Sequence, residues 1–439
     1  MMLTRFSSFL AGSVALSLLA VSATAQIAPG RPPANGPLPV NGPPPALGPQ
    51  GLAGPPSGYG DTVGTRSVPV TGPLPASGPL PIAKQGYIFA GGKYSVVDGK
   101  KVMSGQLYAE YQIPRVQSHP LPIVMVHGAI QTGTNFTGTP DGREGWAQYF
   151  LRQGYAVYVI DQPGRARASY QPALEGPQAF PDLDATQKRF TAPEKFKLWP
   201  QARLHTQWPG SGLEGDPIFD QFFASQVPFV QKAEVAQTLA RDSILALLEK
   251  IGPSIVMTHS QSGAYGWPIV DARPDLVRAL IEVEPSGPPV HDVDYVGAPD
   301  YIRDGAAVRP WGLTAIPLGY APAVGDPSAL SFVQQDRPDG PDLARCWLQK
   351  GPARQLPNLA KVPVLIVNGE ASFHAPFEHC TVKYLQQAGV QPTWISLGEA
   401  GIHGNGHMMM LEKNSDAVAR VMANWLDKVA PETTTASAR

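Results

Sequence analysis

Charge is scarce in this chain of 439 residues, and neither sign dominates. Only 16% of the residues are charged, and the formal net charge is −1. Such a composition offers no basic surface for nucleic acid and none for an anionic membrane. We therefore expect no nucleic-acid partner, and a small molecule that is neutral or apolar as the substrate.

Cysteine is almost absent. Cys346 and Cys380 are the only two, and neither lies in a context typical of a nucleophile, which argues against a thiol enzyme. If the chain is exported, the oxidising compartment allows the two to form one disulfide. Two separate buried thiols are the alternative.

Long hydrophobic runs are missing too. The apolar segment 9–20, which follows Arg5, is shorter than the roughly 20 residues of a membrane-spanning helix. The letters ATA come next and end at Ala25, as in a secretory signal peptide that is cut after Ala25. We expect residues 1–25 to be this signal, the mature protein to be secreted or periplasmic, and no stable membrane anchor to remain. No cysteine lies near the predicted cleavage site, so we do not expect lipoprotein processing.

Proline and glycine, in contrast, are abundant and dominate the segment 26–84. The near repeat GPLPVNGP at Gly36 returns as GPLPASGP at Gly72. Such a segment buries too little apolar surface to offset the entropy of ordering, and it favours extended polyproline conformations. We interpret residues 26–84 as a disordered spacer.

Strand and helix patterns alternate over residues 85–432. An apolar run such as SIVMTH at 254–259 follows a helical pattern at 232–252. This alternation predicts an α/β protein with a mostly parallel central sheet flanked by helices. Two connections, 165–230 and 285–360, are too long for turns, and we expect them to be cap or lid insertions above the active site.

One strand ends in a turn that displays a hydroxyl group. In IVMTHSQSGAYG, which begins at Ile255, a buried strand stops at a serine-rich turn and a helix follows. This arrangement is typical of a nucleophile elbow, with Ser260 directly after the strand. Thr258 and Ser262 replace the usual glycines, and a helix cap is the alternative role for the serine. Ser262 is a weaker candidate, because it would lie further into the helix.

The most distinct candidate for a general base is His407. It lies where the last loop, EAGIHGNGH, meets the last helix, and therefore above the carboxyl edge of the sheet. His403 in the same loop is the alternative. The pair does not favour a metal site, because Gly and Asn between them do not support a helix and no HExxH glutamate is present. We expect no metal and no cofactor.

The acidic residue that would pair with this base has a less conventional position in the sequence. Its usual position follows the strand VPVLIVNGE, where Ser372 stands in place of an aspartate. The preceding strand ends in IEVEP, with Glu284 at its tip and Glu282 one pleat lower on the same face. A buried carboxylate with no polar role would be costly. We choose Glu284 as the acid, with Glu370 as the alternative.

Two loops offer backbone amides for an oxyanion hole. One amide belongs to Gln261, directly after the nucleophile, and the other to Ala129 in the loop HGAIQTG. Gly128 would let the backbone approach a substrate closely. An ordinary glycine loop is the alternative interpretation of HGAIQTG.

Four motifs, HGAIQTG, THSQSG, EVEP and GIHGNGHMMMLEKN, together resemble a small family of secreted bacterial serine esterases in the α/β-hydrolase superfamily. The resemblance implies an α/β-hydrolase fold. It implies Ser260 as nucleophile, Glu284 after strand six as acid and His407 as base. It also implies Ala129 and Gln261 as the oxyanion hole.

The resemblance covers residues 86–429. Some relatives carry cysteines after the His-Gly of the oxyanion loop, where this chain has Ala129 and Ile130. A special redox or structural role of that loop therefore does not carry over.

The motifs occur in the order that predicts a serine hydrolase cleaving carboxylic esters through an acyl-enzyme. Amidase or lactonase action on the same triad stays open, as does a catalytically silent ligand-binding shell, because the elbow lacks its usual glycines. Aromatic residues of the two insertions either line an apolar pocket or form the insertions' own core: Trp199, Trp208, Phe219, Phe222, Phe223, Tyr301, Trp311 and Tyr320. Trp267, just past the elbow, is expected to pack.

Overall fold

The computed structural model describes residues 78–431. The predicted signal peptide and nearly all of the predicted spacer lie outside these residues. Strand β1 (Ile82–Val97) begins within the last residues that we assigned to the spacer, so the folded part starts slightly earlier than the composition indicated.

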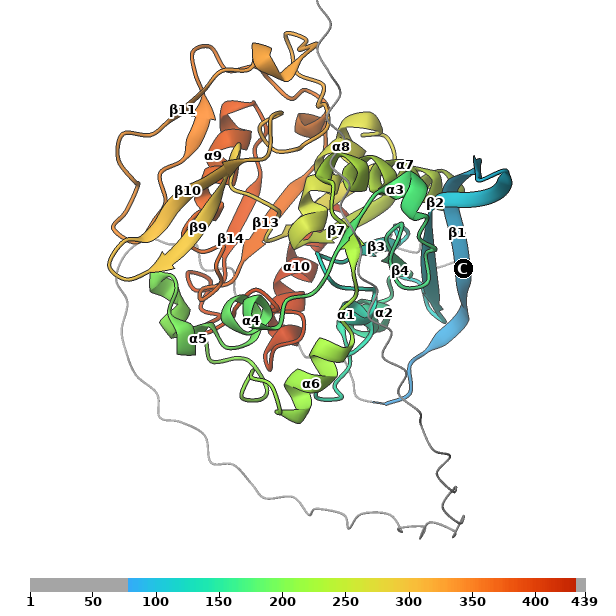
Figure 1. Ribbon diagram of the computed structural model, residues 1–439. Coiled ribbons are helices and arrows are strands. Elements are labelled where there is room, and N and C mark those ends of the chain that lie inside the picture. Colours follow the sequence, from blue (N-terminus) through green and yellow to red (C-terminus); the bar gives the residue numbers. More distant parts are fainter. Residues whose placement is uncertain (1–77, 432–439) are drawn as a thin grey trace, which may run out of the picture. The chain divides into compact units, whose positions relative to one another are not determined.

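An eight-stranded sheet lies at the centre of the described chain, with the strand order β1-β2-β4-β3-β7-β8-β13-β14 (Figure 1). The antiparallel part consists of β1, β2 (Lys100–Pro114) and β4 (Val157–Asp161). From β4 onward the pairing is parallel through β3 (Ile123–Val126), β7 (Ser254–His259), β8 (Val277–Val283), β13 (Val364–Asn368) and β14 (Thr393–Ser396). The predicted mostly parallel α/β sheet is confirmed.

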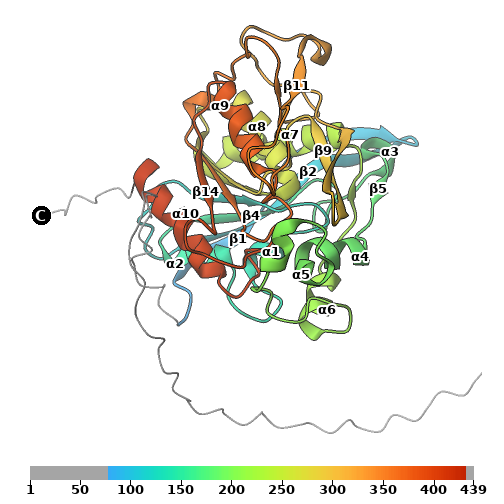
Figure 2. The same ribbon diagram turned by 90° about the vertical axis from the view of Figure 1, so that its left-hand side faces the viewer.

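Helices cover both faces of this sheet (Figure 2). One face carries α2 (Trp146–Arg152) and α10 (Ser415–Val429), and the other carries α7 (Ala233–Ile251), α8 (Gly263–Ala272) and α9 (Glu378–Gln387). Parallel strands covered on both faces need apolar side chains at consecutive positions. In β3, Ile123 and Met125 pack toward α2 and α10, whereas Val124 and Val126 pack toward α7 and α8.

The last helix shows how its sequence selects the buried face. In α10, Val418, Met422 and Leu426 recur at every fourth position, and all three are buried. Asp416 in the first turn and Lys428 in the last turn complement the helix dipole. α10 therefore buries one stripe against the sheet and begins directly after the loop that carries His407.

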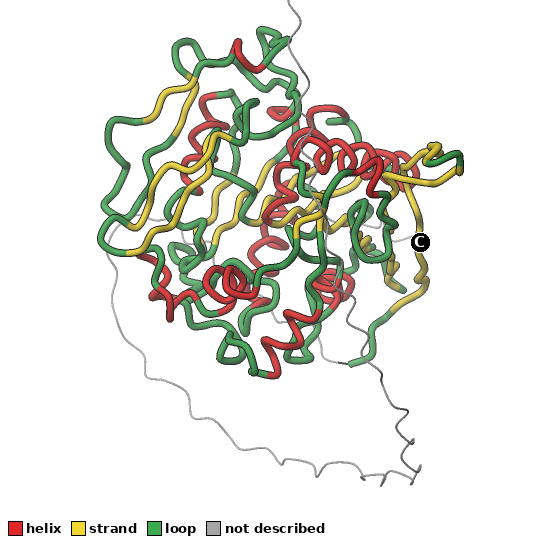
Figure 3. Tube along the Cα trace, in the orientation of Figure 1, coloured by secondary structure: helices red, strands yellow, loops and turns green. Residues whose placement is uncertain are grey.

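The first long connection is mainly helical (Figure 3). Its elements are α3 (Pro172–Glu175), β5 (Gln178–Ala179), α4 (Leu183–Thr186), a π-helical turn (Gln187–Thr191), α5 (Pro193–Phe196), a 3₁₀ turn (Pro200–Leu204), α6 (Pro217–Ala224) and β6 (Phe229–Val230). A short helix α1 (Thr134–Thr137) precedes them after β3.

The second long connection contains two small antiparallel sheets (Figure 3). One pairs β9 (His291–Gly297) with β10 (Tyr301–Ala307), and the other pairs β11 (Phe332–Gln334) with β12 (Trp347–Gln349).

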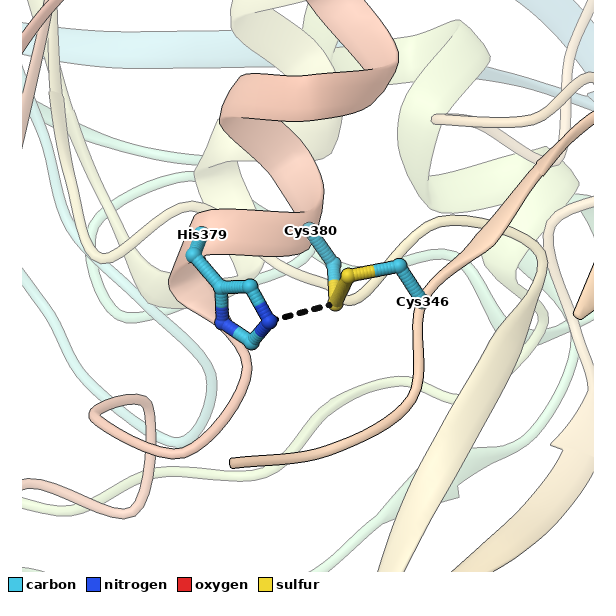
Figure 4. A group of neighbouring side chains, drawn as sticks. All are labelled: Cys346, His379 and Cys380. Carbon is cyan, nitrogen blue, oxygen red and sulfur yellow. Dashed lines mark hydrogen bonds between the residues drawn. A yellow bond between two sulfur atoms is a disulfide. The ribbon is translucent and has the colours of Figure 1, made fainter. Parts of the chain in front are cut away.

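One disulfide joins the second connection to the core of the fold. Cys346, directly before β12, is bonded to Cys380 in the first turn of α9, with their Cα atoms 5.0 Å apart. His379 Nε2 lies 3.5 Å from the Cys380 sulfur (Figure 4). The two cysteines therefore form the disulfide that an exported protein allows, rather than separate thiols.

Candidate active site

Ser260 lies in the tight turn between β7 and α8, where its backbone φ is +56°. A residue other than glycine is strained in this left-handed region, and such strain gathers at functional sites. The helix after the turn needs glycine, since a Cβ atom on Gly263 would lie 2.5 Å from Pro285 and one on Gly266 would lie 2.2 Å from Glu282 Oε1. The chain thus meets the steric demand of an elbow with glycines inside the helix.

Ser262 occupies a position where an elbow usually has glycine. Its buried hydroxyl accepts a hydrogen bond from the His259 amide at 2.8 Å and donates one to the Val126 carbonyl at 2.8 Å. These bonds attach the turn to the end of β3. The Ser262 hydroxyl therefore serves in hydrogen bonds within the fold, whereas Ser260 stays partly exposed.

Glu284 and His407 meet although the sequence separates them by 123 residues. Glu284 follows β8 with φ +49°, and its buried Oε2 accepts a hydrogen bond from His407 Nδ1. The Gly369 amide donates to Oε1 and the Ser372 hydroxyl to Oε2, each at 2.7 Å. Burial raises the pKa of Glu284 to about 8, and these two donors oppose that rise. Ser372, which stands where an aspartate is usual, thus donates a hydrogen bond to the Glu284 carboxylate.

The His407 imidazole is buried among other rings. Its centroid lies 4.5 Å from that of Phe373 and 5.1 Å from that of Phe190. It also stacks on His374 at 5.0 Å. Burial holds the pKa of His407 well below its ordinary value, so the ring is neutral. Because Nδ1 donates to Glu284, Nε2 carries the lone pair, and no described residue hydrogen-bonds to it.

The elbow lies next to this imidazole. His259, directly before Ser260, donates from Nε2 to the His407 carbonyl at 3.0 Å, and the two ring centroids are 4.5 Å apart. On the side of β3, a Cβ atom on Gly128 would lie 2.9 Å from Ser260 Cβ. Ser260 is thus adjacent to both the His407 loop and the predicted oxyanion loop, although its hydroxyl does not hydrogen-bond to His407 Nε2 in this structure.

The loop after β3 turns sharply at Ile130, whose φ is +55°. Ala129 and Gln261 are partly exposed, as Ser260 is, while Gly128 is buried. Within residues 78–431, neither the Ala129 N–H nor the Gln261 N–H donates to another protein acceptor. Both amides are therefore available to a ligand beside Ser260.

Two further carboxyl groups are buried beside the site. The Thr258 hydroxyl donates to Glu282, which is the buried polar role expected for that residue, and burial raises the pKa of Glu282 well above its ordinary value. In α9, Glu378 hydrogen-bonds with His374 Nδ1 at 2.9 Å. Burial raises the pKa of Glu378 to about 8 and lowers that of His374 to about 4. No motif singled out His374, which lies in the irregular loop after β13, or Glu378, which begins α9.

Glu284, His374 and His407 form one of two groups among the described residues whose potential ligand atoms lie within 4.8 Å of one another. Two imidazoles and a carboxylate can bind catalytic zinc. In this structure, however, the Glu284 oxygens accept three hydrogen bonds and His374 Nδ1 pairs with Glu378. The other group contains the two bonded cysteines. The hydrogen bonds favour proton transfer at this position over metal binding.

The alternative acid and base lie together, away from this group of rings. His403 Nδ1 hydrogen-bonds with Glu370 Oε1 at 3.0 Å, and the Gly404 amide donates to Oε2 at 2.8 Å. The His403 side chain is 67% exposed. The structure therefore pairs Glu370 with His403 at the surface and Glu284 with His407 in the interior.

Four of the eight aromatic residues considered for a pocket lie in the two apolar cores instead. Trp208 packs on Phe222 at 5.3 Å, in the apolar core that contains α2 and α10. Trp311, Tyr320 and, as expected, Trp267 belong to the core on the opposite face. The phenyl rings beside His407 are those of Phe190 and Phe373, which no motif singled out. Phe190 lies in the π-helical turn of the first insertion, a feature often found at functional sites.

Comparison with known proteins gives two informative relatives, although no family model matches the chain. A protein described as "Probable secreted lipase phiG", from a fungal species (strain ATCC 74256), is 43% identical over 346 residues, which are 78% of this chain and 89% of the relative. A solved structure of "a Novel Bacterial Esterase" is 25% identical with a TM-score of 0.53, and the match covers 82% of this chain and 99% of that one. The similarity thus includes a fungal protein as well as a bacterial one.

No helix within residues 78–431 is both long and apolar enough to cross a membrane.

Proposed function

Because this chain belongs to the α/β-hydrolase superfamily of lipases and esterases and is a carboxylic ester hydrolase, we propose that Ser260, His407 and Glu284 are its catalytic triad. The observation that carries the proposal is the buried hydrogen bond between Glu284 and His407 next to the strained turn of Ser260. Ser260 is the nucleophile, His407 the general base and Glu284 the acid.

In the first half of the reaction, His407 Nε2 takes the proton of Ser260 as its hydroxyl oxygen attacks the ester carbonyl. The hydrogen bond to Glu284 keeps the Nδ1–H tautomer, which leaves the lone pair on Nε2. His407 then gives its proton to the departing alcohol. A water molecule, activated by His407 in the same way, then attacks the acyl-enzyme and releases the carboxylic acid product.

The Ala129 and Gln261 amides stabilise the oxyanion of each tetrahedral intermediate. Their availability and their position beside Ser260 support this role. An amide donor of this kind contributes roughly 3 to 4 kcal/mol to the transition state, because its full strength is used only when negative charge develops.

The names of the relatives, a lipase and an esterase, favour ester cleavage over amidase or lactonase action. The strain at Ser260 and the neutral His407 argue against a silent ligand-binding shell, since a shell has no need to maintain either. We expect neutral or apolar ester substrates, because the rings of Phe190 and Phe373 lie against His407, the proposed general base.

We also propose that residues 1–25 direct export and are cut after Ala25, which gives a secreted or periplasmic protein. The relative described as a secreted lipase supports this proposal. The low charge gives no reason to expect a nucleic-acid partner.

Ser260→Ala tests the triad. We expect kcat/KM for an aryl ester to fall at least about 1,000-fold, because the nucleophile is removed. A fluorophosphonate probe should label the wild-type protein but not the variant. His407→Ala should match Ser260→Ala, whereas His403→Ala is the control and should keep activity within about twofold, because its side chain is exposed. Full activity of Ser260→Ala, or a wild-type protein that the probe does not label, would contradict the proposal.

A further inference from the structure

Arg165, which follows β4 at the start of the first insertion, is a buried cation that the triad mechanism does not use. Within residues 78–431, no carboxylate forms an ion pair with its guanidinium, and the ring of Phe229 lies 5.3 Å away. Burial lowers the pKa of Arg165 only to about 10, so it stays charged at neutral pH. Asp161 attracts this charge without forming an ion pair with it, and a buried charge without a direct ionic partner depends on its hydrogen bonds.

The two arms of this guanidinium reach the two segments that carry the proposed oxyanion amides. Nη1 donates to the Gly128 carbonyl at 2.6 Å, and Nη2 donates to the side-chain oxygen of Gln261. Gly128 belongs to the loop after β3, and Gln261 to the elbow after β7. One side chain therefore connects both halves of the oxyanion hole.

The first of these contacts acts on the donor peptide itself. The Gly128 carbonyl and the Ala129 N–H belong to one planar trans peptide and point in opposite directions. A cation at the oxygen end fixes the plane of that peptide and draws electron density toward the oxygen, so the N–H at the other end becomes a stronger donor.

A second donor on the same carbonyl strengthens the effect. His127 Nδ1 lies 3.0 Å from the Gly128 oxygen, and the Gln162 amide donates to His127 Nε2 at 3.2 Å. Because Nε2 accepts, Nδ1 must carry the proton of this neutral imidazole and donate it to the carbonyl. The Gly128–Ala129 peptide is thus held at its oxygen by both a cation and an imidazole N–H.

We propose that Arg165 is a positioning residue of the oxyanion hole, which orients and polarises the Gly128–Ala129 peptide and keeps it in register with the elbow through Gln261. The inference rests on the proposed function, since it assigns a role to Arg165 only if Ala129 and Gln261 bind the oxyanion. A lysine cannot reproduce this role fully, because a single ammonium does not have the two-armed planar geometry.

The experiment compares wild-type protein with Arg165→Met and Arg165→Lys. We measure kcat and KM for a neutral aryl ester, and Ki for an aryl trifluoromethyl ketone, which forms a tetrahedral oxyanion on the serine. Arg165→Met should lower kcat roughly 10- to 100-fold and raise Ki by a similar factor, while KM changes less than about threefold. Arg165→Lys should fall between Arg165→Met and the wild type in both quantities.

Arg309 offers a control, although its guanidinium, unlike that of Arg165, forms an ion pair with Asp292 at 2.7 Å. Its guanidinium is also buried, and it donates to the carbonyls of Pro288 and His291, each at 2.7 Å, in the second insertion. Arg309→Met and Arg309→Lys should lower the melting temperature without the parallel change in kcat and Ki. If only the lysine variants fold, the same comparison is made between Arg165→Lys and Arg309→Lys.

Three results would overturn the inference: an unchanged kcat in the Arg165 variants, a loss confined to KM, or changes in kcat and Ki no larger than those of the Arg309 variants. Failure of the proposed triad looks different. In that case the wild-type protein itself resists the ketone, or Ser260→Ala stays active.

Discussion

At the scale of single residues, the proposed acid comes from a strand next to the usual one. Glu284 at the end of β8 reaches His407, and Ser372 after β13 donates to the same carboxylate oxygen. Donated hydrogen bonds favour the charged form of a carboxylate that is buried this deeply. The serine in the usual place of the aspartate therefore belongs to the environment of the proposed acid.

Ser372→Ala tests this role. The hydroxyl favours the charged form of Glu284, so its removal should raise the pKa of Glu284 above the value of about 8 that burial already produces. Glu284 then becomes protonated at a higher pH. The acidic limb of the profile of kcat/KM against pH should therefore shift to higher pH. We expect a loss of about tenfold near pH 7, which corresponds to one hydrogen bond to a charged group.

Ser372→Thr is the control for this prediction, because it keeps the hydroxyl and should keep the limb in place. A limb that stays unchanged in Ser372→Ala, or moves to lower pH, would show that the hydroxyl does not support the carboxylate.

The residues predicted from the sequence share a physical property. Ser260, Glu284 and His407 each follow a strand or loop at the carboxyl edge of a parallel sheet, so chain order alone predicts that they approach one another. Phe190 and Arg165 come from an insertion, whose path depends on tertiary packing. No periodicity or motif marks such residues, and only the folded chain shows what they contact.

At the scale of elements, the first insertion is attached to the loop of the proposed base through His205. This buried ring hydrogen-bonds with Glu194 in α5 at 2.9 Å and with Glu412 at 2.8 Å. Glu412 also accepts from the amide of Gly406, directly before His407, at 2.8 Å. Hydrogen bonds of the neighbouring Thr206 and Gln207 backbone to Gly404 and Lys413 join the same two segments.

The attachment should depend on pH. Burial lowers the pKa of His205, but hydrogen bonds with Glu194 and Glu412 outweigh it and raise the pKa to about 9. Because this exceeds the value of about 6.5 in an unfolded chain, the stabilisation is complete below pH ~6.5 and is lost as pH rises through about 9. His205→Gln should therefore lower the free energy of unfolding by about 2 to 3 kcal/mol at pH 6 and by little at pH 10.

Urea unfolding at pH 6, 8 and 10 measures this difference. The exposed pair of His403 and Glu370 provides the control, since His403→Gln should change stability by less than about 0.5 kcal/mol at each pH. An equal loss for His205→Gln at pH 6 and pH 10 would show that packing, and not charge, makes the attachment.

At the scale of the whole molecule, the order of strands and helices follows from hydrophobic periodicity, because buried parallel strands require continuous apolar runs. The folded boundary was harder to predict. β1 begins at Ile82, and the three residues that follow are exposed, so no apolar alternation marks the start of the strand. Pairing with β2 makes this edge strand, and that pairing is not visible in the composition of β1.

The proposed export of the protein predicts which residue the mature chain begins with. If the segment before Gln26 is a signal peptide, the protein recovered from the medium or periplasm of a producing host should begin at Gln26. Amino-terminal sequencing and the intact mass of the purified protein measure this. Recovery of an exported chain that still begins at Met1 would contradict the proposal.

The bond between Cys346 and Cys380 has a consequence for how a bulky ester enters. With 5.0 Å between the Cα atoms, the second insertion cannot swing away from α9 at this point. The first insertion has no covalent tie of this kind within residues 78–431, and its π-helical turn places Phe190 directly on the His407 ring. We therefore expect any widening of the site for a bulky ester on the side of the first insertion, because the disulfide holds the second insertion beside α9.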